Sequence, residues 1–265
     1  LMAGDDIRFL SADDGSGLES NDGRDPISYR NLWVGIGYLA FPSLDLMGRA
    51  GGAEAETLSS DNDLLTYSLG ANYRPVDALT LMLAYGRDFY AVSPRAVSLG
   101  IFKENASLRM LWTPGLNYRV DASGSQADFS DGNRGWEAAL APSRSVIRSQ
   151  RLNLDLGLHL WWLGFEDQPG NGYYSPVSYQ LYAVKVNGYY KINDNNGIGI
   201  VLTAGEQRDN TSSEFNFGSG GDIEGQFGLH SDWMLRVRSG FTHNVNTRTG
   251  NFDARIYGIN LQKRF

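Results

Sequence analysis

A segment near the middle of the chain alternates apolar and polar residues with a period of two. From residue 152 to residue 160 every even position is leucine, and the odd positions between them are Asn153, Asp155, Gly157 and His159. Successive side chains of a β-strand point to opposite faces, whereas the apolar face of an α-helix recurs every three or four residues. The segment is therefore predicted to be a strand with one apolar and one polar face.

The same alternation recurs along the whole chain, and no segment with helical periodicity competes with it. It covers residues 32–40, 65–73, 79–85, 108–112, 116–122, 152–160, 182–186, 198–204, 223–229, 233–241 and 257–265. Such patterning predicts an all-β, antiparallel fold. We expect about fourteen strands, or sixteen if one hairpin escapes detection.

The connections between these segments are of two alternating kinds. Tight turns are expected at 41–43, 75–77, 113–115, 193–195 and 231–232, and longer, polar, glycine-rich connections at 12–27, 92–103, 129–134, 166–175 and 209–214. A Greek-key sandwich has no reason to gather its short turns at one end, whereas a transmembrane barrel has short turns at one end and long loops at the other. The pattern predicts one up-and-down transmembrane β-barrel spanning residues 1–265, with both termini at the short-turn end.

Composition limits the alternatives. The chain has 265 residues, a formal net charge of −7 and no cysteine, which argues against a nucleic-acid partner and excludes disulfides and thiolate metal sites. No apolar run approaches the ~18 residues of a membrane-spanning helix. A soluble β-sandwich and a membrane barrel both remain compatible with alternating strands.

The aromatic residues favour the membrane barrel. Twelve of them share the parity of the aliphatic face and cluster near strand ends, namely Tyr38, Tyr67, Tyr73, Tyr85, Trp112, Tyr118, Trp136, Trp162, Tyr182, Tyr190, Trp233 and Tyr257. Amphipathic rings at both membrane–water interfaces form such girdles. In a soluble core, so many tyrosine and tryptophan polar groups would need buried partners.

In a membrane barrel the opposite parity lines the lumen. The predicted lumenal and polysaccharide-binding residues are Trp33, Arg109, Arg119, Asp121, Arg151, Asp155, His159, Trp161, Lys185, Tyr189, Arg236 and Arg238. Arg49, Arg74, Glu137, Asp222, Glu224 and Arg264 have the same parity. Two interpretations stay open: facing acids and bases brace the wall by salt bridges, or they line a hydrated channel whose aromatic rings contact sugars.

Catalytic and metal signatures are missing from the sequence. There are only three histidines, and no Gly-x-Ser-x-Gly, His-Glu-x-x-His or calcium-loop motif occurs. We expect neither an enzyme, nor a cofactor, nor a resident metal. The loop carboxylates Asp128, Asp131, Glu166, Asp167, Asp209 and Glu214 are interpreted as solvated, with bridging of lipopolysaccharide by divalent ions as the alternative.

The C-terminal segment Tyr257–Phe265 ends in a phenylalanine that follows alternating apolar residues. This segment resembles the insertion signal that the bacterial barrel-assembly machinery recognises, although Lys263 stands where an aromatic residue is usual. The resemblance implies Phe265 as an assembly signal and places the chain in the bacterial outer membrane, with lipid and lipopolysaccharide around it.

Two loop motifs resemble the C-terminal barrel of the bacterial cellulose-export porin. They are Ser130-Asp131-Gly132-Asn133 and Asn171-Gly172-Tyr173-Tyr174-Ser175-Pro176-Val177-Ser178-Tyr179. In that family a periplasmic tetratricopeptide superhelix precedes a sixteen-stranded barrel, and no 34-residue helical repeat occurs here. The resemblance implies export of an exopolysaccharide such as cellulose through the lumen, with a periplasmic repeat domain or a synthase complex as partner.

The second motif lies at the outer rim and is the candidate gate. Its residues are Gly172, Tyr173, Tyr174, Ser175, Pro176 and Tyr179, where glycine permits a bend and proline stiffens the segment. Two other functions remain open, a general or solute-selective diffusion porin and a structural or adhesive barrel.

Overall fold

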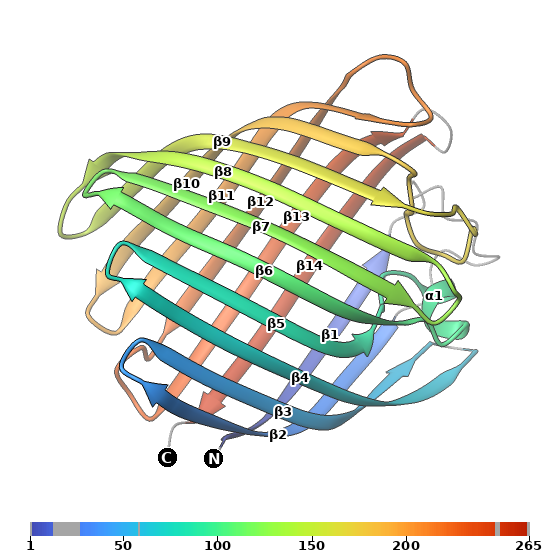
Figure 1. Cartoon of the computed structure of the whole chain (residues 1–265), viewed down its shortest axis with the longest axis horizontal. Coiled ribbons are helices and arrows are strands. Elements are labelled where there is room, and N and C mark those ends of the chain that lie inside the picture. The colour runs from blue at the N-terminus through green and yellow to red at the C-terminus, as the bar shows by residue number, and fades with distance from the viewer. Residues whose placement is uncertain (1, 13–26, 58, 247–249, 264–265) are drawn as a thin grey trace.

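The computed structural model describes residues 2–12, 27–57, 59–246 and 250–263, which form a closed barrel of fourteen antiparallel strands (Figure 1). The elements are β1(Met2–Ala12), β2(Ile27–Phe41), β3(Leu44–Glu56), β4(Asp61–Val76), β5(Leu79–Phe89), α1(Pro94–Ser98), β6(Phe102–Gly115), β7(Tyr118–Phe129), β8(Arg134–Arg148), β9(Leu152–Phe165), β10(Tyr179–Asn193), β11(Asn196–Asp209), β12(Asn216–Phe227), β13(Trp233–Asn246) and β14(Gly250–Lys263). The predicted all-β, up-and-down architecture is confirmed.

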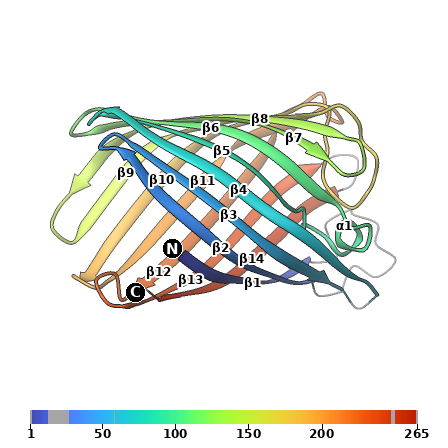
Figure 2. The same cartoon turned by 60° about the horizontal axis from the view of Figure 1, so that its bottom comes forward.

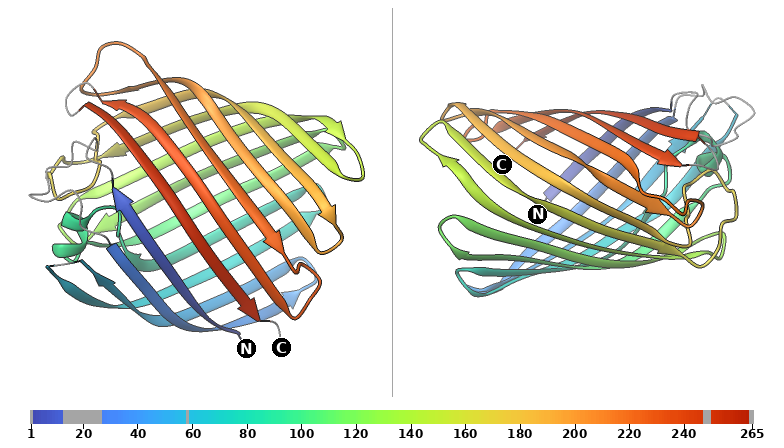
Figure 3. Two further views of the ribbon diagram at one scale, coloured as in Figure 1. Left: turned by 180° about the vertical axis from the view of Figure 1, so that it is seen from behind. Right: turned by 90° about the horizontal axis from the view of Figure 1, so that it is seen from above.

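Each strand pairs with its neighbours in sequence, and β1 closes the barrel on β14 with Phe9 opposite Tyr257. Figure 2 shows the barrel with β2, β3 and β4 across the front, and the left view of Figure 3 shows β1 and β14 side by side. No helix in the described part of the chain is long and apolar enough to cross a membrane.

The two ends of the barrel differ. β1 begins and β14 ends beside one another at the end that carries the tight turns 42–43, 77–78, 116–117 and 194–195 (Figures 1 and 3). The opposite end carries α1 and the longer connection 166–178. Two connections at that end, 57–60 and 130–133, have only four residues, so long loops do not follow every second strand as the sequence suggested.

Register separates the outward face from the inward face. Val184 of β10 stands opposite Leu158 of β9 and Ala204 of β11, and these partners share the outward face. Apolar side chains on this face are open to the surroundings, with Leu65 exposed to 69% and Ile36 to 63%. The twelve predicted girdle residues have the same outward parity in the register of their strands. Apolar surface of this extent, arranged as a belt, suits contact with lipid rather than water.

Buried apolar residues gather on the inner wall at the loop end, in two clusters. The first joins strand ends to α1 and contains Ile27, Tyr29, Ala53, Ala55, Leu64, Phe89 and Val97. The second contains Ala96, Ile101, Ala127, Phe129, Phe165 and Tyr173. Because α1 contributes Val97 to one cluster and Ala96 to the other, the helix lies against the inner wall at this mouth.

Replacement of Val184 by arginine tests the assignment of the faces. An arginine at this outward position meets lipid and should lower the free energy of unfolding by about 2–4 kcal/mol. Asn187→Arg is the matched control, because Asn187 lies on the inward face of the same strand opposite Asp155. Denaturant unfolding in lipid bilayers measures the free energy of unfolding of both variants. Equal losses for the two variants would contradict the assignment.

Candidate functional site

Two connections form a cap at the loop end of the barrel, residues 90–101, which include α1, and residues 166–178. Helix α1 has only five residues and is capped at its N-terminus by Ser93, whose hydroxyl accepts a hydrogen bond from Ala96 N at 3.1 Å. The same hydroxyl donates to the carbonyl oxygen of Gly172. Gly172 has φ +84°, and a Cβ there would lie 2.7 Å from Ala96 N. Only glycine lets the two connections pack this closely.

Tyr173 anchors the cap and is only 3% exposed. Its ring stacks on Phe129 with a centroid distance of 5.2 Å and meets Tyr90 edge-on at 5.4 Å. Its hydroxyl donates to Asp131 Oδ2 at 2.8 Å and accepts from Asn133 Nδ2 at 3.0 Å. The aromatic contacts and the two hydrogen bonds together fix the segment against the wall.

Asp131 is built into this anchor rather than simply solvated, as the sequence had suggested. Burial alone would raise the pKa of Asp131, but hydrogen bonds from Asn171 and Tyr173 and from the backbone of Asn133 outweigh it and lower the pKa. The ionised carboxylate therefore stabilises the folded cap.

A second set of contacts ties the cap to β11 and the connection after it. Tyr174 Oη donates to Asp209 Oδ2 at 2.8 Å, Tyr179 Oη donates to Gln207 Oε1 at 2.6 Å, and Val177 N donates to Asn210 Oδ1 at 2.9 Å. Asp209 is thus another loop carboxylate with a structural partner. The predicted gate residues divide between the two parts: Gly172, Tyr173, Tyr174, Ser175 and Pro176 belong to the cap, and Tyr179 begins β10.

The three aromatic residues predicted to contact sugars have different surroundings. Trp161 donates from Nε1 to Glu137 at 2.9 Å and packs edge-on against Tyr179 at 5.0 Å. The Arg49 guanidinium lies 5.1 Å from the ring centroid of Trp33. Tyr189 lies across Gly197 of the adjacent strand so closely that a Cβ there would collide with the phenol. Its ring therefore lies along the wall.

Charged residues of the inner wall meet in pairs. Arg109 Nε donates to Asp121 Oδ1 at 2.8 Å, and Arg119 Nη2 lies 3.6 Å from the same carboxylate. Elsewhere on the wall, Arg238 Nε donates to Asp222 Oδ2 at 2.6 Å. These pairs agree with the bracing interpretation.

The remaining predicted lumenal residues lie at several levels. His159 and Lys185 have inward parity on β9 and β10, and Arg236 has inward parity on β13. Asp155 lines a cavity of about 560 Å³ at the short-turn end, together with Arg119 and Arg148.

Three predicted residues are placed differently or lie outside the described residues. Arg151 is an exposed residue of the turn 149–151 and not part of a strand, because the Ser149 hydroxyl accepts a hydrogen bond from Leu152 N at 2.9 Å and closes the turn there. Phe265, the predicted assembly signal, lies outside the described residues, as does Arg264.

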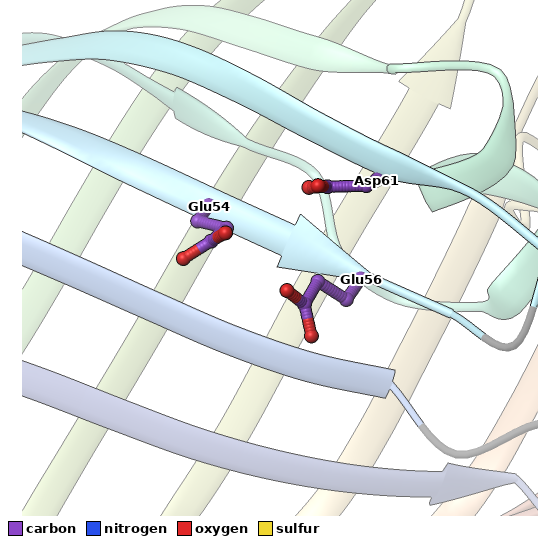
Figure 4. A group of neighbouring side chains, drawn as sticks. All are labelled: Glu54, Glu56 and Asp61. Atoms are coloured by element: carbon purple, nitrogen blue, oxygen red, sulfur yellow. The ribbon is translucent and has the colours of Figure 1, made fainter.

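Three carboxylates lie close enough together to share a cation (Figure 4). Ligand atoms of Glu54, Glu56 and Asp61 lie within 4.8 Å of one another, at the loop end of β3 and β4. Glu54 and Glu56 alternate with the buried, inward-facing Ala53 and Ala55, so these carboxylates stand on the outer surface of the barrel. They contribute nothing to the lumen.

No family model matches the chain, and no curated protein sequence matches it. A solved structure described as a bacterial polysaccharide outer membrane secretin is similar, with a TM-score of 0.74 and 14% identity over 100% of this chain and 98% of that chain. OmpT of Vibrio cholerae is less similar, with a TM-score of 0.48 and 13% identity over 98% of this chain and 96% of that chain. The outer membrane channel DcaP of Acinetobacter baumannii has a TM-score of 0.45 and 11% identity over 99% of this chain and 95% of that chain. The chain has the fold of a bacterial outer-membrane β-barrel.

Substitution of Gly172 by alanine should loosen the cap. The added Cβ meets the backbone of Ala96, and φ +84° is strained for alanine, so a cost of about 1–3 kcal/mol is expected. Gly170→Ala is the control, because Gly170 has φ +68° but its Cβ would meet nothing within 4 Å. Hydrogen exchange of residues 166–178 should rise more in the first variant. An equal rise in both would show that the close packing of Gly172 is unimportant.

Acidification should also loosen the cap. The pKa of Asp131 is lowered in the folded cap, so its stabilisation is present above the ordinary carboxyl pKa of about 4 and is lost as the pH falls through the lower, folded value. Hydrogen exchange of residues 166–178, corrected for its intrinsic pH dependence, should show this loss. Asp131→Asn should be looser at neutral pH and should lack the acid response. An acid response that survives in this variant would assign the effect to another group.

Proposed function

We propose that the chain is an outer-membrane channel that exports an exopolysaccharide, with the cap as its gate. The observation that carries the proposal is the combination of a polar, charged inner wall with an ordered cap at one mouth. A barrel of this size is wide enough for water unless it is plugged. The short-turn end would then face the periplasm and the cap would face the cell surface.

Transport of a polymer needs repeated weak contacts rather than one tight site, since a deep binding well would stall movement. The inner wall offers a flat aromatic surface at Tyr189 and guanidinium and carboxylate groups at Arg109, Asp121, Asp222 and Arg238. Such groups bond sugar hydroxyls, and an aromatic ring stacks on the apolar face of a sugar. The likeness to a structure described as a polysaccharide secretin supports the same function.

The cap suits a gate because side-chain contacts and isolated backbone hydrogen bonds hold it, rather than a continuous strand ladder. Its aromatic cluster and the hydrogen bonds of Tyr173 and Tyr174 can break together without disturbing the strand ladder of the wall. A periplasmic repeat domain or a synthase complex, as the resemblance to the cellulose exporter implies, would deliver the polymer at the short-turn end. A diffusion porin would share the hydrated lumen but would need no closed mouth.

Planar-bilayer recording of the purified barrel tests this function. Gly172→Ala should lengthen open time, and oligosaccharides should interrupt the current. Tyr189→Ala should weaken this block by roughly 2–10-fold, the worth of one aromatic stacking contact. Tyr190→Ala is the control, because Tyr190 lies on the outward face of the same strand. A steady current that no oligosaccharide interrupts would favour the diffusion porin.

A further inference from the structure

Charge is unevenly distributed around the inner wall. On β12 and β13, Asp222 and Glu224 face Arg236 and Arg238, two carboxylates against two guanidinium groups. From β6 to β10 the balance differs. There Arg109, Arg119 and Lys185 lie around one carboxylate, Asp121, and these four residues together with His159 are the basic patch. The other inward carboxylates of these strands lie outside the patch: Glu137 accepts a hydrogen bond from Trp161, and Asp155 lines the cavity at the short-turn end.

One carboxylate cannot neutralise three cations. Asp121 receives a charge-assisted hydrogen bond from Arg109 and lies 3.6 Å from Arg119, so its charge is shared between two guanidinium groups. The charged groups close enough to act on Lys185 are Asp121, Arg109 and Arg119. The basic patch therefore holds three cationic side chains and one carboxylate, and Asp155 lines the same cavity as Arg119.

Lys185 is the cation left for a ligand. It is partly exposed, it stands on the inward face of β10 opposite Gly157 and Thr203, and no hydrogen-bond or ion-pair partner is found for it among the residues the structure describes. Nδ1 of His159, two strand positions from Gly157, is also without a partner in the described chain.

The basic patch lies on the route from the short-turn end. Arg119 belongs to the patch and also lines the 560 Å³ cavity at that mouth, where Arg119 and Arg148 are balanced in charge by the carboxylates Asp77 and Asp155. A fixed positive charge on a low-dielectric wall attracts anions from water and repels cations. Any anion entering the lumen from this end would therefore meet Arg119 and then Lys185.

We propose that the basic patch binds carboxylate-bearing sugars, so that the exported polymer is an acidic polysaccharide rather than a neutral one such as cellulose. The inference rests on the proposed function and specifies its substrate class. Exposed ion pairs in a water-filled lumen are weak and short-lived, which suits a moving chain. As the polymer advances, each carboxylate along it would replace the previous one at Lys185.

The test measures how strongly sugars block the ionic current through the barrel in planar bilayers. The Gly172→Ala variant and the unaltered protein are recorded in parallel. Oligogalacturonates, cello-oligosaccharides of the same length and free galacturonate are added in turn from the short-turn side. Oligogalacturonates should block at the lowest concentration, and raising the salt should weaken that block. Lys185→Gln should weaken it roughly fivefold, and Lys185→Arg should preserve it.

Lys191→Gln is the matched control, because Lys191 is on the same face of the same strand but its Nζ already pairs with Asp194 Oδ1 at 2.5 Å. Equal block by the neutral and acidic oligomers, or an unaltered block in Lys185→Gln, would overturn the acidic substrate while leaving export intact. If free galacturonate blocks the current as strongly as the oligomer does, the substrate would be a small sugar acid and the proposal of a polymeric substrate would be overturned. Absence of block by every sugar would instead overturn the proposed function.

Discussion

The closed ladder of backbone hydrogen bonds is the constraint on which the rest of the structure depends. Lipid offers no partner to a backbone N–H or C=O, so a sheet crosses a membrane only when it has no open edge. Here β1 pairs with β14 and completes the ring. Once the ring is closed, the period of two in the sequence sorts every strand into a lipid-facing and a water-facing set, and the usual apolar core has no place inside.

The buried apolar residues gather instead at one mouth, where α1 and residues 166–178 cover the strand ends. This divides the molecule into a wall held by many backbone hydrogen bonds and a cap held by a few side chains, among them Tyr173 with Phe129 and Asp131. Segments of low local stability are the ones that move in function. A rigid wall with a separately anchored cap therefore agrees with a gated conduit whose substrate contacts, including the basic patch, stay in place when the mouth opens.

Much of the barrel could be predicted from sequence, because strands such as β9 place leucine at successive outward positions, here every even position from 152 to 160. β3 gave no such signal, since its outward positions Gly48, Ala50 and Gly52 are small. The position of the cap in the chain could be predicted, but its contacts could not. Nothing in the neighbouring sequence shows that Tyr173 packs on Phe129 or that it donates a hydrogen bond to Asp131. Likewise, parity placed Arg109, Asp121 and Lys185 in the lumen, and only the register showed that they form one patch on one side of it.

A hydrated lumen is the central claim, and cysteine accessibility along β10 tests it most directly, since the chain contains no native cysteine. Single cysteines would replace Val184, Lys185, Val186, Asn187 and Tyr189 in turn. A membrane-impermeant maleimide should label Lys185→Cys, Asn187→Cys and Tyr189→Cys, and leave Val184→Cys and Val186→Cys unlabelled. Labelling without this alternation, or confined to the two valine positions, would contradict a water-filled lumen and the transport function built on it.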